Sequence, residues 1–173
     1  MYNVIQDTYL FTATCNSWIQ LLTADENKTI ILETLSRYSK DYSLHFHAFV
    51  IMPNHVHFVI GGAEDSLLYF RQSFTRISAH RMLKYLRSEQ PDLLETVLST
   101  QNDRRYHIWE RRSHWLRIRH DKMMRNVIRY VHNNPLQRHW QLCELPEEYP
   151  YSSAKSYATG NAEFDFLTLW GLT

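Results

Sequence analysis

The alternation of apolar and polar residues predicts a strand and a helix in the first forty residues. Residues 9–14 (YLFTAT) are rich in aromatic and β-branched side chains, which is typical of a strand. Within residues 28–39, the apolar side chains recur at three- and four-residue intervals: Ile31, Leu32, Leu35 and Tyr38. Because this spacing places them on one face of a helix, we expect a helix over that range.

Two longer apolar runs predict a β-hairpin. Residues 44–52 (LHFHAFVIM) and residues 55–60 (HVHFVI) both have the composition of strands. The pair Pro53-Asn54 separates the two runs and favours a turn, and Gly61-Gly62 follows the second run. We therefore expect the two runs to pair as antiparallel strands.

The middle of the chain predicts a long helix and two short strands. We expect the helix to extend from Ser66, as its N-terminal cap, to about Arg87, with Pro91 preventing any continuation. Farther along, residues 106–109 and 114–118 each have the composition of a short strand.

A last helix is predicted over residues 122–134, with Asp121 as its N-cap and Pro135 as its end. The expected order is thus strand, helix, strand, strand, helix, strand, helix. This order is typical of an α+β protein of the ferredoxin-like, split βαβ class. We expect an antiparallel sheet with helices on one face, and the last helix near the C-terminal third of the chain.

Length and composition indicate one domain over residues 1–173. The 173 residues include 44% apolar and 21% charged residues, which is close to the average of globular proteins. Residues 140–173, which we call the C-terminal tail, are acidic and rich in Tyr and Ser. We expect this tail to pack on the rest of the domain.

Cysteine content and hydropathy indicate the cellular compartment in which the protein is expected. Cys15 and Cys143 are far apart and form no CxxC motif, so no disulfide scaffold is expected. No apolar run approaches the length of a membrane span, and the first residues do not have the pattern of a secretory signal. We therefore expect a cytoplasmic protein without a membrane partner.

The net charge of +1 conceals an uneven distribution. Between Arg71 and Arg129 lie 14 of the 19 Lys and Arg residues and only 6 acidic residues, which gives that part a net charge of +8. Clustered arginine is typical of a surface that binds a polyanion such as DNA. Two solvated helix faces would give the same count, so charge alone leaves both interpretations open.

Candidate chemistry begins with His55 and His57. In a strand, residues i and i+2 point to the same face, so both imidazoles could bind one metal ion while Val56 points into the core. Two histidines do not complete a metal site, and a third ligand would have to come from elsewhere. Taken alone, such a pair is more typical of histidines that are exposed or only form hydrogen bonds.

A second candidate is Tyr130 with Asn134, which lie one turn apart on the same side of the predicted last helix. A tyrosyl oxygen can attack a phosphodiester, and an amide oxygen is a suitable ligand for a hard divalent cation. Taken alone, Tyr130 is more typical of a packing residue, and Asn134 of a helix end before Pro135. Together with the histidine pair, they predict metal-assisted attack on a phosphodiester.

Four segments then carry a resemblance to a known family. Met52–Val59 (MPNHVHFV) resembles the signature of the HUH single-strand endonucleases, and Tyr130–Leu136 (YVHNNPL) resembles the YIxxNP segment of the IS200/IS605-type single-tyrosine (Y1) transposases. Ile108–Arg112 (IWERR) resembles the strand that precedes their tyrosine-bearing helix. Tyr149–Ser153 (YPYSS) is similar to an element of the REP-associated tyrosine transposases. The motifs follow one another in the family's order and spacing.

The resemblance implies a function and a site. It implies a metal-dependent endonuclease and strand transferase for single-stranded DNA, in which Tyr130 forms a 5′-phosphotyrosine intermediate. It implies His55, His57 and Asn134 as ligands of Mg²⁺ or Mn²⁺. The implied partner is single-stranded DNA with an adjacent hairpin, bound by a monomer or a homodimer.

The resemblance also gives the arginines a role. We expect DNA contacts from eight of them: Arg71, Arg76, Arg104, Arg105, Arg111, Arg112, Arg117 and Arg119. His132 lies too far round the helix from Tyr130 to act as its base, and we expect it at the polar surface. Two other functions stay open: a domesticated, sequence-specific DNA-binding protein without transposition activity, and a metal-site protein without a nucleic-acid role.

Overall fold

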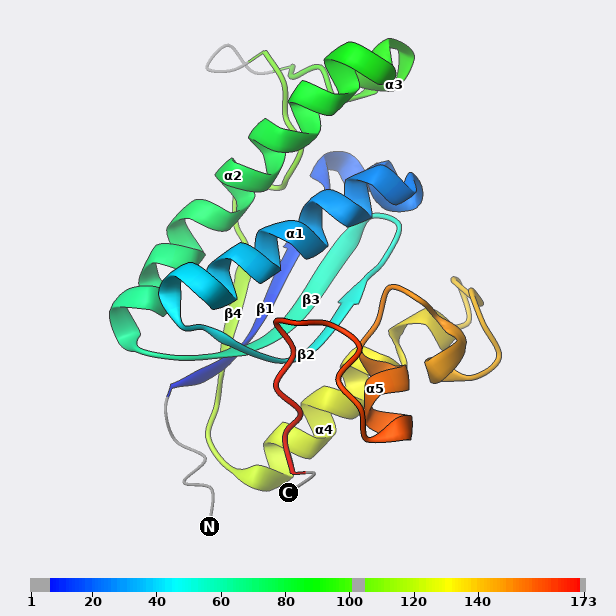
Figure 1. Ribbon diagram of the computed structural model, residues 1–173. Coiled ribbons are helices and arrows are strands. Elements are labelled where there is room, and N and C mark those ends of the chain that lie inside the picture. The colour runs from blue at the N-terminus through cyan, green and yellow to red at the C-terminus, as the bar shows by residue number, and fades with distance from the viewer. Residues whose placement is uncertain (1–6, 101–104, 172–173) are drawn as a thin grey trace.

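One antiparallel sheet organises the molecule, shown in a computed structural model that describes residues 7–100 and 105–171 (Figure 1). Its strands within these ranges are β1 (Thr8–Thr14), β2 (His45–Ile51), β3 (His55–Gly61) and β4 (His114–Ile118). Their order across the sheet is β2-β3-β1-β4. Because β1 and β3 lie at the centre and each joins an edge strand, this is the predicted split βαβ topology.

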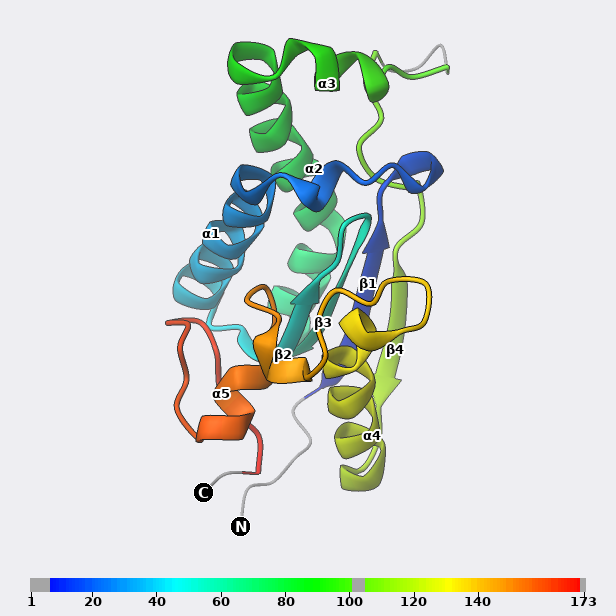
Figure 2. The ribbon, with the colours of Figure 1, turned by 90° about the vertical axis from the view of Figure 1, so that its right-hand side faces the viewer.

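The helices occupy both faces of the sheet, whereas the sequence predicted one. α1 (Asp25–Tyr42) and α2 (Glu64–Glu89) cover one face, and α4 (Asp121–His132) covers the other (Figure 2). Two further helices are short. α3 (Pro91–Thr96) follows α2, and α5 (Ala154–Thr159) belongs to the C-terminal tail. The α+β class is confirmed, but the expectation of helices on one face is wrong.

The physical reason is that both faces of the sheet are apolar. Toward α1 and α2, the core is largely aromatic, and Phe11 of β1 contacts Phe70 and Phe74 of α2 edge to face. Toward α4, a second core contains Val50 and Val59 of the sheet. The apolar stripe of α4 meets this second core with Met124, Val127, Ile128 and Val131.

Helix starts differ from the sequence expectation. α2 begins at Glu64 after Ala63, so Ser66 is not its cap, and Glu64 and Asp65 instead place negative charge in the first turn. α4 begins at Asp121, and its cap is His120, whose Nδ1 accepts a hydrogen bond from the Met123 amide.

The expected strand over residues 106–109 is not formed. Tyr106 and Trp109 make isolated bridges with two different segments, at Leu98 and Cys15. The Trp109 indole is buried and donates a hydrogen bond to the Ser78 hydroxyl. The edge position beside β1 is taken by β4, so these residues have no continuous partner with which to form a ladder. Pro91, which was expected to prevent continuation of the long helix, follows the end of α2 and occupies the first turn of α3, a position where proline is well tolerated.

The C-terminal tail covers the outer edge of β2. The amide of Ile51 donates to the carbonyl of Tyr151 at 2.9 Å, and the amide of Ser153 donates to the carbonyl of Phe49 at 3.0 Å. The hydroxyl of Tyr149 donates to the carbonyl of Ile51 at 2.8 Å. These bonds satisfy an edge that would otherwise present unpaired backbone groups. Within the described ranges, no helix is both long enough and apolar enough to cross a membrane.

His132 is buried between α4 and the tail, which corrects the expectation that it is polar surface. Its Nε2 lies 2.8 Å from the Ser153 hydroxyl, and burial lowers the pKa of the imidazole to about 4. The sequence could not show this burial, because it depends on a residue 21 positions away.

Acidification is therefore expected to destabilise the fold. In the unfolded chain His132 takes up a proton near pH 6.5, whereas the folded protein resists protonation down to about pH 4. The stabilisation is complete above pH 6.5 and decreases as the pH falls toward 4; between pH 7 and pH 5 the loss is about 2 kcal/mol. Other buried histidines contribute to the loss in both proteins, so urea unfolding at both pH values should show a loss in the wild type that exceeds the loss in His132→Gln by about 2 kcal/mol. Equal losses of stability in both proteins would contradict the conclusion that buried His132 resists protonation in the folded state.

Candidate active site

The histidine pair of β3 presents two imidazoles on the face that α4 covers. Val56 is fully buried on the opposite face, in the core beneath α1 and α2, so His55 and His57 point the other way. Their ring centroids lie 4.9 Å apart. The strand alternation expected from the sequence is thus present.

A neighbouring side chain positions each imidazole. The Oγ1 of Thr12, which pairs with His57 across β1 and β3, lies 2.7 Å from His57 Nδ1. The Oδ1 of Asn54 lies 2.7 Å from His55 Nδ1. Because an amide oxygen can only accept, His55 Nδ1–H donates to it, and the lone pair of the neutral ring is then on Nε2.

α4 and the turn after it bring the other two predicted residues to these rings. The hydroxyl of Tyr130 lies 3.3 Å from His57 Nε2, and the two ring centroids are 5.2 Å apart. Asn134 begins the 3₁₀ helix Asn134–Leu136, and its Oδ1 lies 3.2 Å from His55 Nε2. One chain therefore brings all four side chains together.

Burial sets the protonation of the two imidazoles. His57 is 5% exposed, and burial lowers its pKa to about 3, with the neighbouring His55 adding to the shift. Burial also lowers the pKa of His55. Both rings are therefore neutral at neutral pH, the form in which imidazole binds a metal. Tyr130, in contrast, is 46% exposed, so an extended substrate could reach its side chain.

The donor set fits a divalent cation. His55 Nε2 and Asn134 Oδ1 face each other as two acceptors, and the buried Nδ2 of Asn134 has no hydrogen-bond partner among the described residues. A cation between the two acceptors would relieve their repulsion. His57 supplies a third donor close by. No cluster of three or more His, Cys, Asp or Glu side chains suited to a metal exists in residues 7–100 and 105–171, so the amide is needed to complete the set.

The predicted arginines do not form one surface. Arg71 and Arg76 are exposed on α2, on the face of the sheet away from Tyr130. Arg117 pairs with Tyr9 across the sheet and forms an ion pair with Asp7. These three arginines are therefore not brought to the site.

The remaining predicted arginines are spread over the connections. Arg104 lies outside the described residues. Arg105 is exposed, and its guanidinium lies 5.5 Å from the centre of the Tyr106 ring. Arg111 and Arg112 are exposed just after Glu110, whose amide donates to the carbonyl of Thr14, and Arg119 is exposed after β4. Since Thr14 pairs with His55, Arg111 and Arg112 follow a segment at the same end of the sheet as the site.

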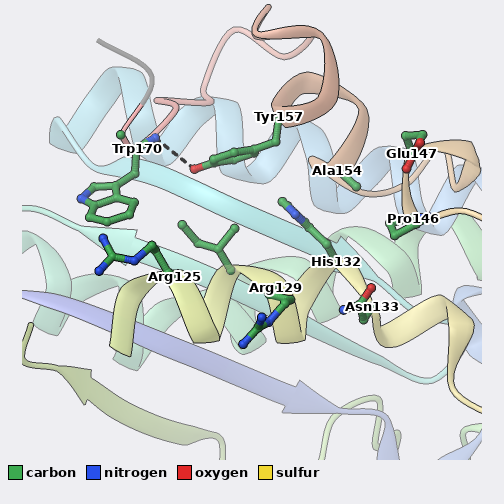
Figure 3. A pocket seen from close by; sticks show the side chains of 11 residues that line it. Arg125, Arg129, His132, Asn133, Pro146, Glu147, Ala154, Tyr157 and Trp170 are labelled. Carbon is green, nitrogen blue, oxygen red and sulfur yellow. Dashed lines mark hydrogen bonds between the residues drawn. The ribbon is translucent and has the colours of Figure 1, made fainter. Parts of the chain in front are cut away.

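The structure adds two arginines that were not among the predicted contacts. Arg125 and Arg129, on α4, line a cavity of about 620 Å³ between that helix and the C-terminal tail (Figure 3). The Arg125 guanidinium lies 5.8 Å from the centre of the Trp170 ring. This cavity contains none of the four side chains described above. The signal in the sequence is the four-residue spacing of the two arginines, which places them on one side of the helix.

Comparisons with known proteins agree with this architecture. No protein-family model matches the chain, and no curated protein matches it. Among solved structures, a REP-associated tyrosine transposase bound to a REP hairpin resembles the chain, with a TM-score of 0.58 and 20% sequence identity, over 100% of this chain and 91% of the other.

A protein from Deinococcus radiodurans R1, provisionally described as a transposase, matches 77% of this chain and 95% of its own, with a TM-score of 0.48 and 17% identity. The first likeness covers every element described above. The chain therefore has the fold of a REP-associated tyrosine transposase, the type of protein that its motifs resemble.

Proposed function

We propose that this protein is a metal-dependent enzyme that cuts and transfers single-stranded DNA, with Tyr130 as its nucleophile. The observation that carries the proposal is the Tyr130 hydroxyl, 3.3 Å from His57 Nε2 and next to the facing acceptors of His55 and Asn134. A tyrosyl oxygen beside three groups suited to bind a metal ion is an arrangement that favours attack on a phosphodiester.

The proposed reaction is a transesterification. The Tyr130 oxygen loses its proton and attacks the phosphorus, and the bond between phosphorus and the 3′ oxygen breaks. The leaving 3′ oxygen takes up a proton, so the products are a 5′-phosphotyrosine and a free 3′ hydroxyl. Because one phosphoester replaces another, a 3′ hydroxyl from a second strand can reverse the reaction and rejoin the DNA.

The chain's own residues fix the geometry for this step. His55, His57 and Asn134 would hold Mg²⁺ or Mn²⁺, which when bound supplies a positive charge to the attacked phosphate. Thr12 and Asn54 contact the Nδ1 atoms of the two rings, so each Nε2 stays directed toward the site. The buried apolar stripe of α4 fixes the helix against the sheet, and with it the backbone of Tyr130.

The proposed substrate follows from exposed arginines on the helix that carries Tyr130 and near the end of the sheet that carries His55. Arg129 precedes it, and Arg125 lies one turn earlier, both exposed on α4. Arg111 and Arg112 are exposed near the end of the sheet that carries His55. The structural neighbour was solved with a REP hairpin, and we extend that substrate to this chain: single-stranded DNA flanked by a hairpin.

The two arginines of α4 give a quantitative prediction. Each phosphate contact with a single strand contributes about 0.7 to the slope of log affinity against log salt. Arg125→Ala and Arg129→Ala should each weaken binding of a single-stranded oligonucleotide and lower this slope by about 0.7. Arg76→Ala, on the opposite face, is the matched control and should leave the slope unchanged. The slopes can be measured by fluorescence anisotropy; an unchanged slope in both α4 variants would contradict the proposed path of the strand.

The function is tested by incubating the protein with labelled single-stranded oligonucleotides of varied sequence and Mn²⁺. A band of protein-linked DNA on a denaturing gel is the expected result. Site-selective binding without any such band would instead support a DNA-binding protein that has lost its enzymatic activity. Binding that is absent, or that does not depend on salt, would contradict any role with nucleic acid.

A further inference from the structure

An exposed tryptophan lies in an unfavourable backbone conformation near the site. Ser17 and Trp18 have φ angles of 55° and 59°, in the left-handed region that side chains other than glycine rarely adopt. Trp18 is 68% exposed, the most exposed large apolar side chain in the part of the chain that the structure describes. Neither burial nor local preference therefore explains its position.

Hydrogen bonds hold this turn in place. The Ser17 amide donates to Glu110 Oε1 at 2.9 Å, and the Trp18 amide donates to the carbonyl of Cys15 at 3.0 Å. The Asn16 amide donates to the carbonyl of Ile108 at 2.8 Å. The backbone is thus fixed from two sides while the indole stays in solvent. Such a strained, well-supported turn is typical of a functional surface.

The turn is connected to a predicted metal ligand through one side chain. Asn54 Nδ2 donates to the Trp18 carbonyl at 3.4 Å, while Asn54 Oδ1 accepts from His55 Nδ1 at 2.7 Å. The Cys15 amide also donates to the Asn54 carbonyl at 2.7 Å. Figure 2 shows the segment that carries Trp18 beside the tip of the β2–β3 hairpin, where β3 begins. Trp18 and His55 therefore belong to one hydrogen-bonded unit.

Two exposed arginines follow directly after the residue that holds the Trp18 turn. Glu110, which binds the Ser17 amide, is followed directly by the exposed Arg111 and Arg112. An aromatic ring beside cationic side chains is the composition with which proteins bind single-stranded nucleic acid: the ring stacks on a base and the cations contact phosphates. A protein partner with an apolar surface would leave these arginines desolvated, so the charge favours DNA as the occupant.

We propose that Trp18 stacks on an unpaired base of the substrate strand, close to the phosphate that Tyr130 attacks. This inference rests on the proposed function and adds to it a residue that positions the strand. Because every base has an aromatic face, stacking on Trp18 would fix where the strand lies without selecting its sequence. Asn54, which forms hydrogen bonds with the Trp18 carbonyl and the His55 ring, would hold Trp18 at a fixed position relative to His55.

The test compares the affinity of four proteins for one single-stranded oligonucleotide: wild type, Trp18→Ala, Trp18→Phe and Tyr42→Ala. Tyr42 is an exposed aromatic residue at the end of α1, on the other face of the sheet, and serves as the control. Trp18→Ala should raise Kd by about tenfold or more, Trp18→Phe by less, and Tyr42→Ala not at all. Circular dichroism melting verifies that all four proteins are folded.

Abasic substitutions at successive positions then separate stacking from an indirect structural effect. At one position of the oligonucleotide, removing the base should raise the Kd of the wild type by about the same factor as Trp18→Ala raises the Kd for the intact strand. Trp18→Ala should then bind this abasic strand no more weakly than it binds the intact strand. Additive losses at every position would overturn the inference, as would equal affinities of Trp18→Ala and the wild type; both results leave the proposed function standing. A wild type that binds no single-stranded DNA would overturn the proposed function, and this inference with it.

Discussion

Replacing Tyr130 with phenylalanine is expected to abolish the protein–DNA adduct while leaving DNA binding within about twofold of the wild type. The substitution removes only the hydroxyl that lies 3.3 Å from His57 Nε2, and with it the proposed nucleophile. Loss of a nucleophile lowers the rate by many powers of ten, so the adduct should fall by at least about 10³-fold. Denaturing gels measure the adduct, and anisotropy measures the affinity.

Two controls sharpen this experiment. Tyr42→Phe removes a hydroxyl on the opposite face of the sheet and should keep full activity. A mixture of Tyr130→Phe and His57→Ala tests whether one chain holds the whole site, as the close approach of the two side chains indicates. The mixture should form no adduct. Restored activity would mean that the tyrosine of one chain acts with the histidines of another.

The second large effect is expected from His57→Ala, which removes one of the three proposed metal donors. Substitutions outside the ligand shell already lower metal affinity by 10- to 100-fold, so loss of a ligand should weaken Mn²⁺ binding by about a hundredfold or more. Titration calorimetry or electron paramagnetic resonance of Mn²⁺ at pH 7 measures this without DNA. His80→Ala, which removes an exposed histidine on α2, is the control. Unchanged Mn²⁺ affinity in His57→Ala would contradict the metal site.

Local patterns were enough to predict most of the sheet and the orientation of the side chains within each half of the candidate site. The hairpin follows from two apolar runs around Pro53-Asn54, and the shared face of His55 and His57 follows from strand alternation. One helical turn between Tyr130 and Asn134 places both on one side of the chain. Each of these predictions depends only on residues that are close in sequence. The contact between the two halves of the site was implied by the family resemblance, since spacing alone cannot join segments more than 70 residues apart.

The sequence could not predict features that depend on distant partners. A continuous apolar run such as β2 has core residues on both faces, so it does not show that α4 lies on the face away from α1 and α2. Residues 106–109 have strand composition but lack a neighbouring strand. His132 is buried because Ser153 of the tail contacts it.

Charge was the least informative signal. The basic middle of the chain correctly indicated many exposed arginines, but the fold distributes them over both faces of the sheet. Arg71 and Arg76 lie on the α2 side, whereas Arg125 and Arg129 lie on α4, on the other face of the sheet. Composition counts charges along the chain, and only the packing of α2 and α4 decides which of them share a surface.

The most direct test of the account is to identify the residue that becomes linked to DNA. The wild-type protein is incubated with a cleavable single-stranded oligonucleotide and Mn²⁺, digested with trypsin and analysed by mass spectrometry. Cleavage after Arg129 and Arg138 gives the peptide 130–138, in which Tyr130 is the single tyrosine. We predict that this peptide carries a nucleotide through a 5′ phosphate. Linkage to another residue, or cut DNA with a free 5′ phosphate and no linked peptide, would contradict the central claim.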